Sequence, residues 1–235
     1  MTVVRSRAQR IGLLVITLAV VVQTLLHLVN YFTWEVRWLD VNEEYTPFSA
    51  MGALTLAAAA GGAFLLVRAG LAARRVGWSL AALLAVFALD EFFSLHERGT
   101  DLLLDLVGVS RDLDSVVWPA LYLPMTGAAF LLMVLLARRA PESVRRLLYV
   151  GLALLVIAVV AEIASAPFST ADTADETVHA IEGVFEEACE LGGWGLIALA
   201  LLSWPSVRRS SVPLDDLPAA RPSAGSTRQE GRPVP

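Results

Sequence analysis

The run GWSLAALLAVFALDEFFSLHE, residues 77–97, decides how this chain folds. It is about as long as the 20 residues that cross the hydrocarbon core of a bilayer as a helix. Only a helix satisfies all the backbone hydrogen bonds of such a run in lipid, so we predict a membrane-spanning helix here. Two adjacent acids, Asp90 and Glu91, lie near its end and need a separate explanation.

Further apolar runs of similar length lie on both sides of this one. They are residues 11–32, 48–68, 116–137, 147–166 and 184–204. Composition agrees, since 56% of the residues are hydrophobic and 17% are charged, whereas soluble domains carry about a quarter charged residues. The first run is too long for a cleaved signal peptide and lacks a small-residue cleavage site. We therefore predict an all-α, polytopic membrane bundle of six transmembrane helices that forms a single domain over residues 1–204.

Arginine placement predicts the orientation of this bundle. Segments 1–10, 68–76, 138–146 and 205–235 hold 15 of the 18 basic residues, all of them arginine. Cytoplasmic loops of membrane proteins carry an excess of arginine and lysine. We expect both termini to be cytoplasmic and the protein to be a multi-pass protein of the cell inner membrane. Segment 205–235, with six prolines among Ser, Arg and Ala, is predicted to be a disordered cytoplasmic tail.

Ionisable residues recur inside the predicted spans at one depth. His27, Asp90, Glu91, Glu162 and Glu190 each lie about five or six residues from the outer end of a span, which corresponds to roughly 5–10 Å at 1.5 Å per residue. An ionisable group within a span costs a few kcal/mol and is a functional hypothesis by default. The shared depth predicts that several spans contribute to one polar layer in the outer half of the membrane.

Helical spacing indicates which of these side chains share a face. Asp90, Ser94 and Glu97 lie at i, i+4 and i+7 and so share a face. His96 points away from that face, unless the helix ends or unwinds near Gly99. In the last span, one acidic stripe contains His179, Glu182, Glu186 and Glu190. Gly193 continues this stripe, and a glycine there lets another helix approach closely.

Histidines and carboxylates that converge from several helices are typical of metal sites in helical bundles. Imidazole with carboxylate suits Zn²⁺ or Fe, whereas carboxylates alone suit Ca²⁺ or Mg²⁺. The predicted ligands of a divalent metal, Zn or Fe, are Asp90, His96, Glu97, His179, Glu186 and Glu190. The predicted general base is Glu162 or Glu91. No HExxH or His-x-x-x-His motif is present.

Three functions remain open from these residues. The first is a membrane-embedded hydrolase whose metal activates water to attack a lipid-type ester or amide. The second is a proton- or cation-coupled carrier. The third is a non-catalytic membrane partner whose acidic outer layer binds another protein or divalent ions at the surface. Separately, His27 is also consistent with a hydrogen-bonded core histidine beside Gln23 and Asn30. The net charge of −5 excludes a nucleic-acid partner, so the expected partner is the lipid bilayer. The sequence does not determine an oligomeric state.

Two short motifs carry a resemblance to a known group of proteins. The motifs are D-E-x4-H-E, formed by Asp90, Glu91, His96 and Glu97, and E-E-x-x-E, formed by Glu186, Glu187 and Glu190. In them the chain resembles uncharacterised bacterial multi-pass membrane proteins. The resemblance covers the third to sixth spans, about half of the chain, and implies a shared fold without a known activity.

A looser similarity is to the membrane hydrolase superfamily that includes the alkaline ceramidases. It implies a zinc site of histidines, an aspartate and a serine near one membrane face. Asp90, His96 and His179 match that chemistry, with Ser94 or Ser49 nearby. The chain departs from the pattern in having six predicted spans instead of seven, no paired histidines in the last span, and more glutamates.

Overall fold

The computed structural model describes residues 7–34, 36–39, 46–107, 114–169 and 176–210. Apart from short turns, these ranges are helical. The α-helices are α1 (Arg7–Val29), α2 (Pro47–Arg68), α3 (Arg74–Phe93), α4 (Leu95–Val107), α5 (Asp114–Ala137), α6 (Glu142–Ser169) and α7 (Glu176–Ser210). A π-helical turn, η1 (Asn30–Trp34), and a 3-10 turn, η2 (Arg37–Leu39), follow α1. The predicted all-α class is confirmed.

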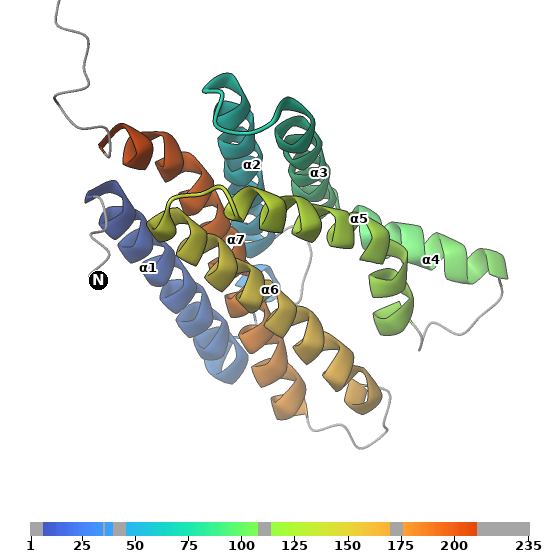
Figure 1. Cartoon of the computed structure of the whole chain (residues 1–235). Helices are drawn as coiled ribbons and strands as arrows, with labels where there is room; N and C mark the ends of the chain where they lie inside the picture. Colours follow the sequence, from blue (N-terminus) through green and yellow to red (C-terminus); the bar gives the residue numbers. More distant parts are fainter. Residues whose placement is uncertain (1–6, 35, 40–45, 108–113, 170–175, 211–235) are drawn as a thin grey trace, which may run out of the picture.

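The last long helix, α7, is the centre of the bundle. It packs against α1, α2 and α6, while α3 pairs with α2 and α5 lies against both α3 and α6. Figure 1 shows α1, α6 and α7 running side by side, with the α2–α3 hairpin beside them. The start of α1 and the end of α7 are joined by a buried hydrogen bond from Gln9 Nε2 to Ser203 Oγ (3.3 Å). Both ends of the described chain therefore lie at the same end of the bundle.

Five helices are long and apolar enough to cross a membrane. They are Arg7–Thr33, Pro47–Arg68, Arg74–Phe93, Glu142–Ala161 and Ile181–Arg208, and a shorter apolar helix spans Leu121–Ala137. Each apolar run predicted from the sequence overlaps one of these helices, and the runs 11–32, 48–68 and 184–204 lie entirely within theirs. The described part thus contains five membrane-length helices, where the sequence predicts six.

Local sequence explains how α2 and α3 begin and end. Thr46 Oγ1 accepts a hydrogen bond from the Ser49 backbone N–H (3.3 Å), and Pro47 occupies the first helical position, where its missing N–H costs nothing. The turn into α3 passes through Gly70, whose φ of +69° is favourable for glycine. This turn and the start of α6 place most of the described arginines at one end of the bundle.

Two glycines allow α6 and α7 to approach closely. A Cβ added at Gly193 would lie 3.0 Å from the Gly151 carbonyl oxygen, and one added at Gly151 would lie 2.8 Å from the Gly193 carbonyl oxygen. Neither position can hold a side chain without a shift of the backbone. The close approach predicted at Gly193 is confirmed, and its partner is Gly151.

Two predicted boundaries are wrong. The third span ends at Phe93 instead of residue 97, because the backbone leaves the helix at Ser94. The last helix continues to Ser210, so the first residues of the predicted tail are helical. Pro205 removes one backbone hydrogen bond, but Trp204 is 1% exposed and Val207 packs against the core, which keeps the last turns in place. Residues 211–235 lie outside the described residues.

Candidate polar site and apolar cavity at the α3–α4 junction

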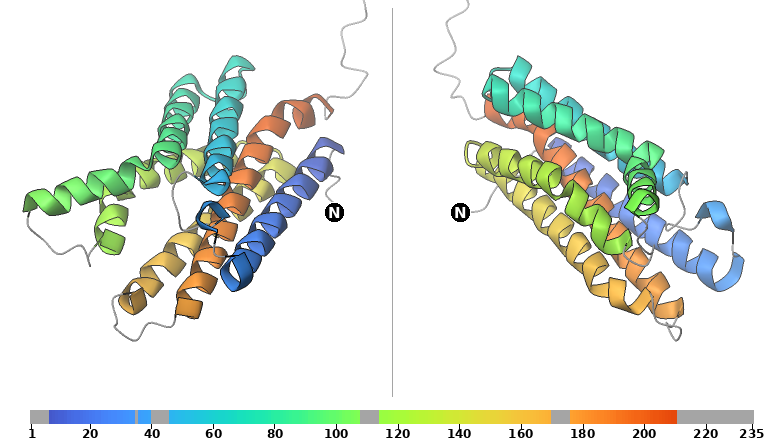
Figure 2. Two further views of the ribbon diagram at one scale, coloured as in Figure 1. Left: turned by 180° about the vertical axis from the view of Figure 1, so that it is seen from behind. Right: turned by 90° about the vertical axis from the view of Figure 1, so that its right-hand side faces the viewer.

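The junction between α3 and α4 is a single residue in an unusual conformation. Ser94 has φ 49° and ψ 48°, the left-handed region, and its N–H caps the helix by donating to the Asp90 carbonyl. A non-glycine residue in this region costs about 1–2 kcal/mol. Ser94 is also buried. The chain thus changes direction within one residue, and α4 leads away from the end of α3 (Figure 2).

This change of direction places His96 directly over Asp90. Asp90 Oδ1 accepts the His96 backbone N–H (2.7 Å), and Asp90 Oδ2 lies 3.2 Å from His96 Nδ1. Asp90 Oδ1 also accepts the hydroxyl of Tyr122 from α5 (3.0 Å). The sequence predicts that His96 points away from Asp90 unless the helix ends or unwinds near Gly99; the helix ends at Phe93, and His96 therefore contacts Asp90.

Asp90 is buried, at 8% exposure, and both of its carboxylate oxygens take part in these contacts. With Nδ1–H donating to Asp90, a neutral His96 carries its lone pair on Nε2. A carboxylate on one ring nitrogen fixes the tautomer and orientation of the imidazole, as in catalytic and metal-binding histidines. The Tyr122 ring stands edge-on to the His96 ring, with centroids 6.0 Å apart. Asp90 thus holds the His96 ring in one orientation, with Nδ1 toward the carboxylate.

The charge of His96 is governed by the acids around it. Burial by itself lowers its pKa, but the hydrogen bond and charge of Asp90 act in the opposite direction, with smaller contributions from Glu91 and Glu190. The net effect raises the pKa of His96 above its ordinary value of 6.5. The raised pKa means that the carboxylate of Asp90 stabilises the protonated form of His96.

An apolar cavity of about 380 Å³ opens beside this histidine. Its walls come from α4 and the start of the apolar part of α5. It is lined by Leu95, His96, Gly99, Thr100, Leu102, Leu103, Leu106, Leu121 and Tyr122. His96 and Tyr122 supply the ionisable groups in this lining, and Thr100 Oγ1 is directed to the His96 carbonyl (2.8 Å). Ligand sites are typically concave and apolar, with a few oriented polar groups, as here.

A second polar group lies between α1, α3 and α7. Gln23, at 3% exposure, directs its Nε2 to Glu187 Oε2 (3.5 Å). Glu91 on α3 lies within electrostatic reach of Glu190 and Glu187. Its carboxylate rests against α2, where a Cβ at Gly52 would be 2.5 Å from Glu91 Oε1. The polar layer expected from the sequence thus forms in part, and it joins acids of α3 to acids of α7.

The structure brings some of the predicted site residues together and not others. Asp90 and His96 are in direct contact, and Glu190 and Glu91 lie within electrostatic reach of His96. Glu91, one of the two predicted general bases, does not line the cavity. Glu186 lies within electrostatic reach of Cys189 on its own helix. The side chains of Glu97, Glu162 and His179 lie outside the described residues, so their predicted roles stay predictions.

The described residues do not by themselves make a metal site. Among them, no three His, Cys, Asp or Glu side chains gather in a way that could hold a metal ion. Both oxygens of Asp90 already accept hydrogen bonds. His96 Nε2 is a suitable metal ligand because of its carboxylate partner. A complete coordination sphere would need donors beyond the described side chains, such as Glu97 and His179.

Tyr122 is not among the residues predicted for the site, and Ser94 has a different role from the predicted one. Tyr122 lies in an apolar run, about as far from the outer end of its run as Asp90 is from the end of its own. This shared depth could have indicated that its hydroxyl meets Asp90. Ser94 was placed on the face of Asp90 by its side chain, yet its contribution is the backbone turn. A serine rarely adopts this turn, so no local rule would have found it.

The comparisons with known proteins identify a family without a function. The family model described as "Domain of unknown function (DUF8692)" matches residues 11–204 of the chain. The match includes every residue of the α3–α4 junction and of the cavity. No curated protein and no solved structure matches the chain.

Proposed function

The chain belongs to the DUF8692 family, whose description assigns no activity, and we propose from its geometry that it is a membrane-embedded hydrolase of lipid-type substrates. The observation that carries this proposal is the Asp90–His96 pair at the wall of an apolar cavity. Histidine is the commonest general base in enzymes, and Asp90 orients the His96 imidazole. The leucines around it suit an acyl chain and exclude a polar substrate.

The proposed reaction is hydrolysis of a lipid ester or amide. His96 Nε2 takes a proton from water, whose oxygen bonds to the carbonyl carbon of the substrate. The bond from that carbon to the alcohol oxygen or amine nitrogen then breaks, and the leaving group takes the proton from His96. The products are a fatty acid and an alcohol or amine. Asp90 acts as a positioning residue that stabilises the imidazolium formed in the first step.

The proposed setting is the outer half of the cell inner membrane. We propose six spans, with α5 as the sixth and both termini in the cytoplasm, because the arginine-rich turns lie at one end of the bundle. The cavity lies at the other end. Leu102, Leu103 and Leu106 of α4 are exposed, as expected for a helix lying at a membrane interface. A tag at residues 108–113 that is accessible only from the cytoplasm would contradict this topology.

We also propose an alternative form of the site in which a divalent metal, Zn or Fe, binds His96 Nε2, which then no longer acts as the base. Its ligands would come from His96 together with Glu97 and His179. The described residues carry the base role of His96 without it, so no step above depends on a metal. Elemental analysis of the purified protein separates the two forms, since a stoichiometric metal that is lost in His96→Gln would make His96 a ligand.

The test is release of fatty acid from a bacterial lipid extract by the full-length protein in detergent. We expect wild type to release fatty acid and His96→Gln to lose at least about 100-fold of the rate, the lower range for a general base. Asp105→Asn, which changes an exposed acid of the same helix, is the matched control and should retain the rate. Equal release by wild type and His96→Gln would reject the proposal.

A proton- or cation-coupled carrier is a second candidate, favoured by the group formed by Gln23, Glu91, Glu187 and Glu190. These side chains lie between helices away from the cavity, and Gln23 Oε1 has no hydrogen-bond partner among the described residues. Proteoliposomes that show pH-driven cation flux in wild type, but not in Glu190→Gln, would favour the carrier. Flux unchanged by Glu190→Gln would count against it.

A further inference from the structure

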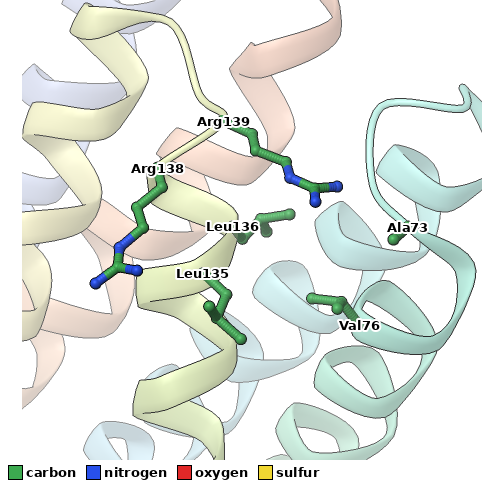
Figure 3. Close-up of a pocket in the computed structure, with 6 residues that line it drawn as sticks. All are labelled: Ala73, Val76, Leu135, Leu136, Arg138 and Arg139. Carbon is green, nitrogen blue, oxygen red and sulfur yellow. The ribbon is translucent and has the colours of Figure 1, made fainter.

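A second cavity lies at the opposite, arginine-rich end of the bundle. It measures about 300 Å³ and is bounded by the start of α3 and the end of α5. Its lining is Ala73, Val76, Leu135, Leu136, Arg138 and Arg139. Figure 3 shows Val76 and Leu136 directed toward each other across the gap, with Arg139 extending from the end of α5 toward α3 and Arg138 along the other side of α5. The cavity therefore has apolar walls and a cationic rim.

The two arginines of the rim lack anionic partners within the described chain. Arg138 and Arg139 are exposed, and neither belongs to the ion pairs His96–Asp90 and Arg146–Glu142 that described side chains form. The planar guanidinium group of arginine binds phosphate with two parallel hydrogen bonds. Two such groups beside one cavity indicate an anionic occupant.

The α3 side of the cavity adds backbone N–H donors. Ala73 is the N-cap of α3 and makes no side-chain capping hydrogen bond. The N-terminal amides of a helix carry partial positive charge and bind phosphate oxygens. α3 has 20 residues, so its dipole is fully developed at this end. The first turn of α3 and the side chain of Arg139 thus border the same cavity, while Arg138 extends along the other side of α5.

We propose that this cavity binds the phosphate-bearing headgroup of an anionic phospholipid, with part of the lipid chain against Val76, Leu135 and Leu136. Phosphate is the shared chemistry of a lipid headgroup and of free phosphate, and the apolar walls favour the lipid. Basic pockets between helices on the cytoplasmic side of a membrane bind such headgroups. The proposal rests on the membrane insertion proposed above, but not on the hydrolase activity.

Native mass spectrometry of the full-length protein in detergent tests this site. The probes are phosphatidylglycerol, phosphatidylcholine and inorganic phosphate. We expect one phosphatidylglycerol per chain to bind more tightly than phosphatidylcholine, and the Arg138→Gln/Arg139→Gln variant to weaken that binding about tenfold. Because Arg139 reaches over the gap, Arg139→Gln alone should weaken binding more than Arg138→Gln alone.

Two further variants separate a built site from diffuse attraction. Arg7→Gln/Arg10→Gln removes the same charge from the same end of the bundle but from outside the cavity, and should leave binding unchanged. Val76→Trp fills the cavity and keeps all arginines, and should abolish the tight binding even if the double arginine variant fails to fold. Equal losses in the two double variants, or full binding by Val76→Trp, would overturn the proposal. Inorganic phosphate that binds as tightly as the lipid would overturn the assignment to a lipid.

Discussion

Replacing Asp90 by Asn tests the interaction on which the site depends. Asn keeps the size of the side chain and one oxygen, so Tyr122 and the His96 backbone N–H keep their acceptor. What is lost is the negative charge that faces His96 Nδ1 at 3.2 Å. A hydrogen bond to a charged group contributes about 1.5–3 kcal/mol. We therefore expect Asp90→Asn to lower the free energy of unfolding by about 2 kcal/mol.

The loss should depend on pH in a defined direction. Because the pKa of His96 is raised in the folded state, its interaction with Asp90 contributes fully below the ordinary pKa of 6.5 and is lost as the pH rises through the folded value. The difference in the free energy of unfolding between wild type and Asp90→Asn should therefore be larger at about pH 6 than at about pH 9.

The buried thiol of Cys189 supplies the assay. It is the single cysteine of the chain and is buried in α7, so a thiol-reactive fluorophore reports unfolding of the purified protein in detergent. A loss of about 2 kcal/mol corresponds to a fall in Tm of about 4–8 °C for a chain of this size. Asp105→Asn is the control and should shift Tm by less than about 2 °C, as surface changes do. A deficit that is the same at both pH values, or the same in the control, would refute the reasoning.

Three other predictions follow from single positions. Ser94→Gly should be neutral or raise stability by up to about 1 kcal/mol, since glycine adopts the left-handed turn freely, whereas Ser94→Val should destabilise the fold by about 2 kcal/mol or more in the same thermal assay. Gly193→Ala should cost about 1–3 kcal/mol through its contact with the Gly151 carbonyl, while Gly61→Ala, with open space around it, should not; equal Tm values would contradict the close packing. If hydrolysis is found, its rate should rise with pH through a pKa above 6.5, because His96 must be neutral, and a pH-independent rate would argue against this base.

Much of the bundle was predictable because long apolar runs have few possible structures in lipid. The all-α class and the close approach at Gly193 follow from run length and from the absence of a side chain. The turn at Ser94 was not predictable, because it opposes the local preference of serine and is held by contacts from distant residues. One of these is the hydroxyl of Tyr122, which bonds to Asp90 across 32 positions of the chain.

The same limit applies to the site. The charges at Asp90, Glu91 and Glu190 indicated a polar layer, because ionisable groups in apolar runs need partners. In the structure Asp90 contacts His96, whereas Glu91 lies with Glu190. This division depends on the direction that α4 takes after α3, and the spacing of residues in the sequence does not predict that direction. The choice of Glu91 as a general base and the choice of Asp90 as a metal ligand were made without that direction. The geometry instead favours His96 as the reactive group and Asp90 as its support.

The most direct test of the proposed hydrolase changes the base and the cavity separately. Hydrolysis of a long-chain nitrophenyl ester is measured for wild type, for His96→Gln and for Leu103→Trp, which fills the cavity but leaves Asp90 and His96 unchanged. We expect turnover by wild type and its loss in both variants, with the thermal stability of Leu103→Trp retained. Full turnover by a folded Leu103→Trp variant would contradict the claim that the cavity beside His96 is where the substrate binds.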